Sequence, residues 1–173
     1  MTDHKQARER ALTLAALSGL KIAFGPAFLA KAQGWPSGRS WLLAAMGEMV
    51  LDKMGVFPPR WRPSLLIPHT AAGAWTAHES LKADGVDDPS TVALAAAVAA
   101  GVAVAAPVVR IALNRGIGIP DALLALAEDY IALRAGIRVT GLSMDEIGRD
   151  ARGSLEHVRG QVMPTLQSVG VGA

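Results

Sequence analysis

Two pairs of carboxylates stand within otherwise apolar stretches of the sequence. Glu48 and Asp52 are four residues apart, so on a helix they share one face. Glu128 and Asp129 are neighbours in a later stretch. Carboxylates that face each other from two helices are what a proton relay or a cation site needs, because desolvation raises the pKa of a carboxyl group toward neutrality. These four residues are the candidate ion or proton relay.

Basic residues in the same stretches are the candidate charge partners: Lys21, Lys53, Arg110 and Arg134. Lys21 stands in the middle of an apolar run, so it must find a partner or water. Asp121 follows Pro120 and is expected at a helix start, where a carboxylate accepts hydrogen bonds from free backbone N–H groups.

A packing role is the alternative for all of these charges. Lys53 and Arg134 are long enough to extend to lipid headgroups. Glu48 with Lys21, or Glu128 with Arg110, would then be buried pairs that only fix the packing of helices.

Several other chemistries are excluded or not expected. The chain has no cysteine, which excludes disulfides, cysteine-ligated zinc, iron–sulfur clusters and thiol catalysis. His69 and His78 are too far apart in sequence for a metal pair on one helix. No phosphate loop, nucleophile elbow or dinucleotide fingerprint is present, so neither a cofactor nor an enzymatic activity is expected. A net charge of +2 gives no indication of nucleic-acid binding.

The elements that must position these charges are apolar segments of membrane-spanning length. Of the 173 residues, 51% are hydrophobic and only 18% are charged, which indicates a membrane protein rather than a water-soluble domain. The segments are residues 11–30, 40–57, 63–81, 89–110 and 120–139. Only the fourth has eighteen or more consecutive uncharged residues, from Pro89 to Val109. The others need charge partners on neighbouring helices, because an ionisable residue at the bilayer centre costs about 2.5–3.5 kcal/mol.

The sequence therefore predicts an all-α integral membrane bundle of five spans over residues 1–142. An alanine-rich water-soluble helical bundle is the alternative. The fourth segment argues against it, because that segment has no polar face to present to water.

An internal repeat is a further prediction, because the first two segments resemble the fourth and fifth. Pro26 and Pro107 lie 81 residues apart, and Glu48 and Asp129 have the same offset. An odd number of crossings per repeat would invert the second pair relative to the first, as in many transporters. The alternative is that the match arises by chance, because alanine-rich helices resemble one another.

The tail, residues 143–173, differs in kind. Ser143 and Glu146 have the spacing of a capping box, and apolar residues then recur at steps of three or four, which predicts an amphipathic helix. This helix is expected either to lie on the membrane surface or to pair with another helix.

Counts of lysine and arginine favour a cytoplasmic N-terminus in the cell's inner membrane. With five spans, the inner side gathers Lys5, Arg8, Arg10, Lys53, Arg60, Arg62, Arg110 and Arg115. The tail would then lie on the opposite side, where its arginines oppose this orientation.

Four motifs carry a resemblance to a known family. They are Gly19-Leu20-Lys21, then Gly47-Glu48-Met49-Val50-Leu51-Asp52-Lys53, then the Pro58-Pro59-Arg60 turn leading to Gly73-Ala74, and finally Ile119-Pro120-Asp121 with Leu126-Ala127-Glu128-Asp129. Together they resemble an uncharacterised bacterial family of small multipass membrane proteins. The resemblance covers about residues 11–142, and Lys21 departs from it, since arginine is expected there more often. It implies a membrane protein and emphasises the acidic motifs, but it supplies no substrate.

Three functions from different classes follow. The first is a small proton- or ion-coupled transporter or channel that uses the four carboxylates as its relay. It has the lipid bilayer, a small ion or solute and a second copy of the chain as partners. The second is a structural or partner-binding membrane protein. An intramembrane enzyme acting on lipid ranks last, because it lacks an evident nucleophile or metal site.

Overall fold

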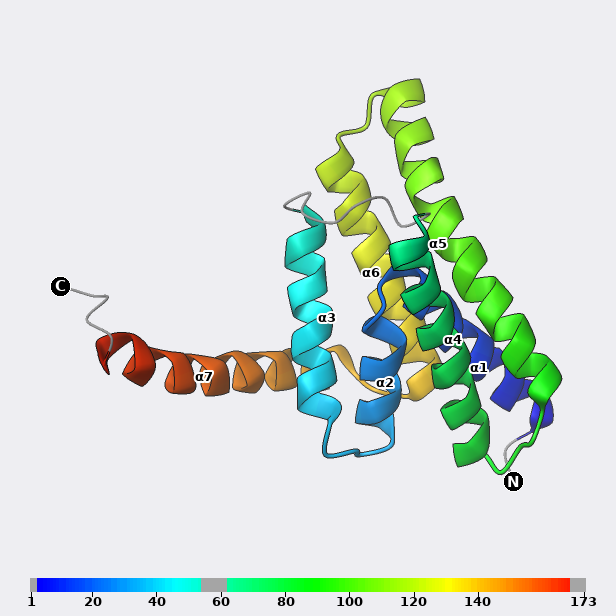
Figure 1. Ribbon diagram of the computed structural model, residues 1–173, viewed down its shortest axis with the longest axis horizontal. Helices are drawn as coiled ribbons and strands as arrows, with labels where there is room; N and C mark the ends of the chain where they lie inside the picture. The colour runs from blue at the N-terminus through cyan, green and yellow to red at the C-terminus, as the bar shows by residue number, and fades with distance from the viewer. Residues whose placement is uncertain (1–2, 54–61, 169–173) are drawn as a thin grey trace.

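The computed structural model describes residues 3–53 and 62–168, with side chains through residue 156. These residues form seven helices and no strand, so the all-α class is confirmed for them. The helices are α1 His4–Leu20, α2 Phe24–Ala32, α3 Gly38–Lys53, α4 Pro63–Ala83, α5 Pro89–Ile117, α6 Asp121–Thr140 and α7 Met144–Ser168 (Figure 1). Residues 54–57 of the second predicted segment, the Pro58-Pro59-Arg60 turn and residues 169–173 of the tail lie outside the described residues.

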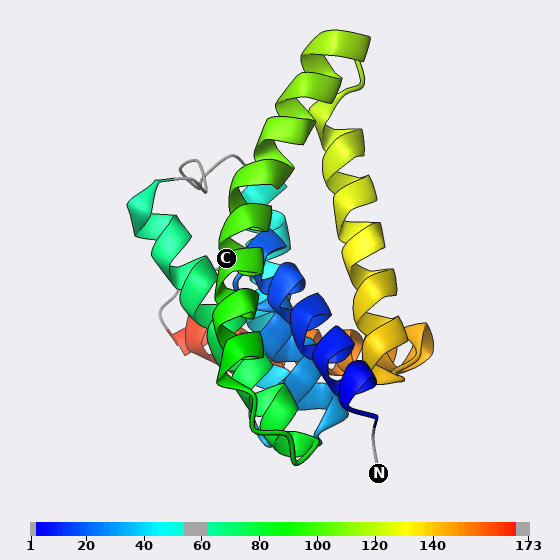
Figure 2. The same ribbon diagram turned by 90° about the vertical axis from the view of Figure 1, so that its right-hand side faces the viewer.

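The first predicted segment, residues 11–30, differs from the expectation of one continuous helix. α1 ends at Leu20, the chain reverses over residues 21–23, and α2 returns beside α1 (Figures 1 and 2). Gly25 allows this close return, because a Cβ there would collide with Ser18 Oγ and lie 2.5 Å from the Leu14 carbonyl oxygen. Pro26 lies in the first turn of α2, where its missing N–H costs nothing. We call α1 and α2 the helical hairpin and residues 21–23 its tip.

Small residues let three helices meet closely. Gly73 of α4 lies against Ala99 of α5 and Ala15 of α1, and a Cβ at Gly73 would collide with the Ala99 side chain. A Cβ at Gly19 of α1 would lie 2.5 Å from the Ala99 carbonyl oxygen. α1 is consequently held between α4 and α5 by backbone-to-backbone approach, as in many membrane helix packings.

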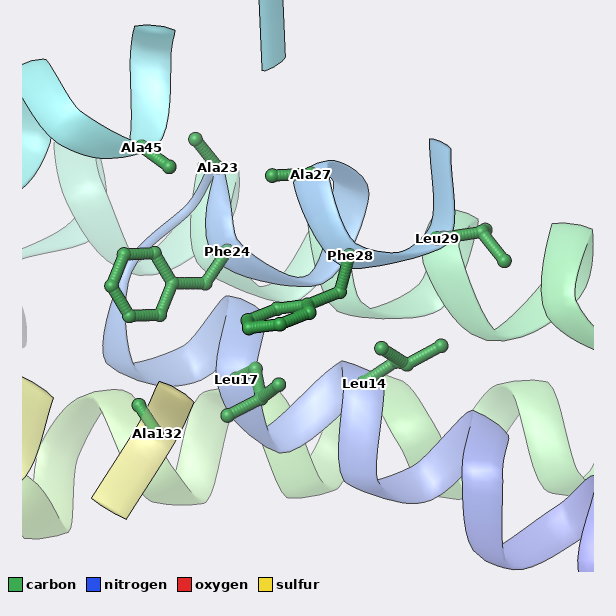
Figure 3. Packing of buried hydrophobic residues seen from close by; sticks show 9 residues of the cluster. All are labelled: Leu14, Leu17, Ala23, Phe24, Ala27, Phe28, Leu29, Ala45 and Ala132. Atoms are coloured by element: carbon green, nitrogen blue, oxygen red, sulfur yellow. The ribbon is translucent and has the colours of Figure 1, made fainter. Parts of the chain in front are cut away.

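The apolar core lies inside and beneath the hairpin. Leu14 and Leu17 of α1 face Phe24 and Phe28 of α2 (Figure 3). Further buried members of this cluster are Ala23, Ala27, Leu29, Ala45 and Ala132. On α6, Gly136 makes room for the ring of Phe28.

Helices α3 to α6 run along the length of the bundle. α3 and α5 lead toward the end that carries the α5–α6 turn, and α4 and α6 return from it (Figures 1 and 2). We call that end the apex and the opposite end, formed by residues 33–37, 84–88 and 141–143, the base. α1 begins at the base and α6 ends there, so the N-terminus and the start of α7 share one end. α7 then leaves the bundle sideways (Figure 1).

Helix ends follow their local sequence. Asp88 caps α5 by accepting a hydrogen bond from Thr91 N at 3.0 Å. The predicted capping box is confirmed at α7, where Glu146 Oε2 accepts from Ser143 N at 2.7 Å and Ser143 Oγ accepts from Glu146 N at 3.2 Å. α5 and α6 end at Gly118 and Gly141, whose φ values of 73° and 74° suit glycine.

The predicted inverted repeat has no counterpart in this architecture. α1 and α2 turn back at the hairpin tip, whereas α5 continues through Pro107 to Ile117. Gly19 is closely packed, whereas nothing lies within 4 Å of a Cβ at its counterpart Gly101. The matching spacing reflects the shared alanine-rich composition rather than a shared fold.

One helix in the described part of the chain is long and apolar enough to cross a membrane. It is α5, whose most apolar 18-residue stretch has a mean hydropathy of 2.4 and is only 17% buried.

Candidate functional site

Lys21 lies at the hairpin tip and is 2% exposed. Its backbone N–H bonds to the Leu17 carbonyl at 2.9 Å and so closes α1. Its Nζ lies 3.2 Å from Asp52 Oδ2, 3.1 Å from Asp129 Oδ1 and 3.9 Å from Glu128 Oε1. One ammonium group thus joins the hairpin to α3 and α6, and its burial requires these partners.

Arg110 of α5 extends the set of ion pairs toward the apex. Its Nη1 lies 3.4 Å from Asp52 Oδ2 and 3.9 Å from Glu128 Oε2. Its Nη2 and Nε donate to the two oxygens of Asp121 at 2.6 and 3.1 Å, which is the two-pronged geometry that arginine makes with a carboxylate. Asp121 is the first residue of α6, as predicted, but both oxygens of its carboxylate accept from Arg110 rather than from the free backbone N–H groups expected at the helix start.

Lys53 completes the set through an ion pair with Asp129 Oδ2. We call these residues the ionic network: Lys21, Lys53, Arg110, Asp52, Asp121, Glu128 and Asp129. They come from the hairpin tip, α3, α5 and α6. The sequence predicted that carboxylates from two helices and buried cations would meet, and the structure brings them together.

Glu48 does not form the ion pair with Lys21 that the packing alternative predicted from the sequence. Its Oε1 accepts from Ile22 N at 2.8 Å and its Oε2 from Ala23 N at 3.0 Å. These amides belong to the hairpin tip, at the N-terminal end of α2, where the helix dipole favours a negative charge. Glu48 therefore fixes the tip from α3, and the tip holds Lys21 in the network.

Exposure within the network increases in one direction. The side chain of Asp129 is 5% exposed, that of Glu128 is 11%, that of Asp52 is 17% and that of Asp121 is 60%. Asp121 lies at the apex, beside the α5–α6 turn. Toward the base, the apolar cluster around Phe24 and Phe28 follows directly on the tip (Figure 3). The most exposed carboxylate of the network thus lies at the apex, and the apolar cluster lies on the side of the base.

His69 of α4 is a buried polar residue that sequence reasoning did not connect to the site. It is 2% exposed, and its Nδ1 lies 2.6 Å from the carbonyl oxygen of Ser18 on α1. A carbonyl can only accept, so Nδ1 carries the proton in this contact. The bond satisfies a carbonyl near the end of α1, where helices leave such groups free.

The network does not include the predicted partner Arg134. Arg134 lies on the exposed surface of α6, five residues after Asp129. Five residues turn a helix by about 140° from Asp129, which directs the two side chains away from each other. Within the described residues, no group of three or more His, Cys, Asp or Glu side chains is arranged to hold a metal ion.

Comparison with protein-family profiles, with curated proteins and with solved structures finds no match to this chain. The resemblance noted from the sequence motifs therefore stays a prediction. The fold and the site together define the class as an all-helical protein with a buried ionic network at the tip of a helical hairpin.

Proposed function

We propose that the protein is a multi-pass membrane protein in which α3, α4, α5 and α6 cross the bilayer and the helical hairpin enters from the base and turns back. The low burial of α5 supports this, because the core helix of a water-soluble protein of similar hydropathy would be mostly covered by its neighbours. Large apolar side chains are exposed on other helices too, including Val50, Ile67, Leu123, Leu126 and Ile131. A lipid environment removes this surface from water.

This arrangement gives four crossings and a re-entrant hairpin in place of five spans. The N-terminus and the tail then share the base, so the tail no longer opposes the predicted orientation. Basic residues gather at the base: Lys5, Arg8, Arg10, Lys31, Arg39, Lys82, Arg138, Arg149 and Arg152. Fewer described ones flank the apex: Lys53, Arg62 and Arg115. The excess favours a cytoplasmic base.

The function that best fits the site is proton- or cation-coupled transport. The observation that carries it is the network itself: buried carboxylates from two helices meet a buried lysine at the tip of the hairpin, and the exposed carboxylate Asp121 lies at the apex. Discontinuous helices of this kind form the ion sites of many transporters, and access from one side is one state of an alternating cycle. A carboxylate such as Asp129 would exchange a proton or hold a cation as access changes.

Reconstituted liposomes test the proposal. The full chain is placed in liposomes that enclose a pH-sensitive dye, a potassium diffusion potential drives proton entry, and a sodium gradient with a sodium-sensitive dye serves as the second probe. We expect Asp129→Asn to lower the flux at least tenfold, with Glu128→Gln as a second variant. Asp87→Asn changes an exposed carboxylate outside the network and is expected to leave the flux unchanged. Wild-type flux equal to that of empty liposomes with both probes would contradict transport of these ions.

A structural role is the second candidate, because each central cation joins several helices. Lys21 holds α3 and α6 to the hairpin tip, and Arg110 holds α3 and α6 to α5. If the charges serve packing alone, Asp129→Asn lowers the thermal midpoint of unfolding and wild type carries no flux. Under the transport proposal, the loss of flux exceeds what the fraction of folded protein explains.

A further inference from the structure

A second feature lies nearer the base, between α2, α3, α6 and α7. It is an apolar cavity of about 190 Å³. Its walls include Phe28 of α2, Met46 and Met49 of α3, Leu133 of α6 and Ile147 of α7. No residue of the ionic network lines it, so its ligand is a separate question from transport.

The lining restricts the ligand to hydrocarbon. All lining residues except Lys31 present only carbon or thioether sulfur to the cavity, and a lining of that kind favours hydrocarbon over water. An apolar cavity of about 150 Å³ accommodates a six-carbon ring, so the present cavity takes part of one acyl chain. Methionine side chains adapt to a flexible chain better than branched ones do.

Lys31 determines which polar headgroup a ligand in this cavity can carry. It lines the cavity, and its Nζ lies 2.5 Å from Asp150 Oδ2 of α7, with side-chain exposures of 27% and 33% for the pair. The rim therefore carries one partly exposed cation whose present partner is a carboxylate. A carboxylate or phosphate headgroup is likewise an anionic hydrogen-bond acceptor, so it can replace Asp150 at Lys31.

α7 contributes both to the apolar wall of the cavity and to its charged rim. Ile147 and Ala151 form one wall of it, and Asp150, from the same face of the helix, closes the rim. From this geometry we infer that the cavity binds a single acyl chain of an anionic amphiphile, with the chain among α2, α3, α6 and α7 and the headgroup on Lys31. The headgroup takes the place of Asp150, so occupancy loosens the hold of the bundle on α7.

Calorimetric titration of the full chain tests this inference, in a fluorinated surfactant whose tails mix poorly with hydrocarbon. The probes are three ten-carbon amphiphiles: decanoate, decyl phosphate and decyltrimethylammonium. We expect saturable one-site binding that is at least tenfold tighter for an anionic probe than for the cationic one. Tighter binding of decanoate indicates a fatty acid as the natural ligand, and tighter binding of decyl phosphate indicates a phospholipid.

Matched variants separate the cavity from general affinity for amphiphiles. Ala45→Leu fills the cavity from α3 and Ala151→Leu fills it from α7, and each is expected to weaken binding at least tenfold. Ala44→Leu adds the same atoms at an exposed neighbouring position outside the lining and is expected to bind as wild type does. Lys31→Gln is expected to remove the preference for anions. The inference is overturned if wild type shows no saturable binding, or if both cavity-filling variants bind as tightly as wild type.

Discussion

Lys21 is the residue on which the site depends, because its ammonium group is buried and borders three carboxylates. A buried cation is stable only while its partners are present, and the partners depend equally on it. The charge of Lys21 thus joins the hairpin tip to α3 and α6.

Replacement of Lys21 by methionine keeps most of the length of the side chain and removes its charge. We expect Lys21→Met to lower the free energy of unfolding by about 3–5 kcal/mol, since it leaves buried carboxylates without their cation. Addition of Asp129→Asn is expected to restore part of the loss. Denaturant unfolding of the two single variants and the double variant measures the coupling, and exposed Lys82→Met is the control. A loss for Lys21→Met no larger than that of the control would show that the ion pairs contribute little.

The residue types and their apolar surroundings were sufficient to predict most of the network. Buried charges must pair, so Lys21, Lys53 and Arg110 could be assigned to the carboxylates without knowledge of the fold. The prediction that Arg134 is a charge partner was wrong. Helical geometry argues against a pair with Asp129, because the two residues lie about 140° apart around the helix. The partners of Glu48 could not be predicted, because they are amides that only a chain reversal leaves free.

At the scale of the elements, the reversal at residues 21–23 was hidden within a continuous apolar run. Hydropathy does not distinguish one long helix from two short antiparallel ones, because both bury the same side chains. Lys21 and the pair Gly25 and Pro26 were the available signals: a polar break, a residue for close approach and a proline suited to a first helical turn. Proline within a helix is also common in membrane proteins, so Pro26 alone did not indicate a new helix start.

Close approach of α1, α4 and α5 gives a prediction with a matched control. Gly73→Ala places a Cβ against the Ala99 side chain, and overpacking of this kind costs typically about 1–3 kcal/mol. Gly101→Ala makes the same change on α5 in open space and is expected to be neutral or to stabilise by up to about 1 kcal/mol through helix propensity. Thermal unfolding of both variants measures the difference. Equal midpoints would mean that the three helices separate easily.

The start of α5 gives a prediction of pH dependence. Hydrogen bonds from the Ser90 and Thr91 side chains and from the Thr91 backbone N–H hold the pKa of Asp88 well below its ordinary value. A carboxylate whose pKa is lower in the folded state stabilises above its unfolded pKa of about 3.9, and the effect is lost as the pH falls further. Asp88→Ala should therefore lower the thermal midpoint most near pH 7, and the difference from wild type should shrink below about pH 4. A difference that is constant from pH 7 to pH 3, or one equal to that of Asp87→Ala, would contradict this role.

At the scale of the whole molecule, the hairpin sets the number of crossings in the proposed membrane arrangement and thereby the side on which the tail would lie. Five spans would separate the tail from the N-terminus, whereas a hairpin with four crossings keeps both at the base. The sequence predicted the all-α class and the amphipathic tail. Whether the number of crossings is odd or even, however, depends on one turn of three residues.

Labelling of single cysteines tests the arrangement, and the chain is suited to it because it contains no cysteine. Ser37→Cys marks the base and Gly116→Cys marks the apex, and both positions are exposed. In intact cells we expect a membrane-impermeant maleimide to label the cysteine at position 116, and to label position 37 only after permeabilisation. The opposite pattern would invert the orientation. Labelling of both positions in intact cells would contradict a bilayer between them.

The position of Lys21 near the start of the chain has a consequence for biosynthesis. Its carboxylate partners lie on α3 and α6, and Asp129 leaves the ribosome roughly 100 residues later, which takes roughly 5–20 s at ordinary rates of synthesis. During that interval Asp52 is the only one of these carboxylates that has been synthesised, so Lys21 still lacks the two partners that α6 supplies. The N-terminal hairpin is therefore completed last although it is synthesised first, and a nascent chain that stops before α6 leaves Lys21 without Glu128 and Asp129.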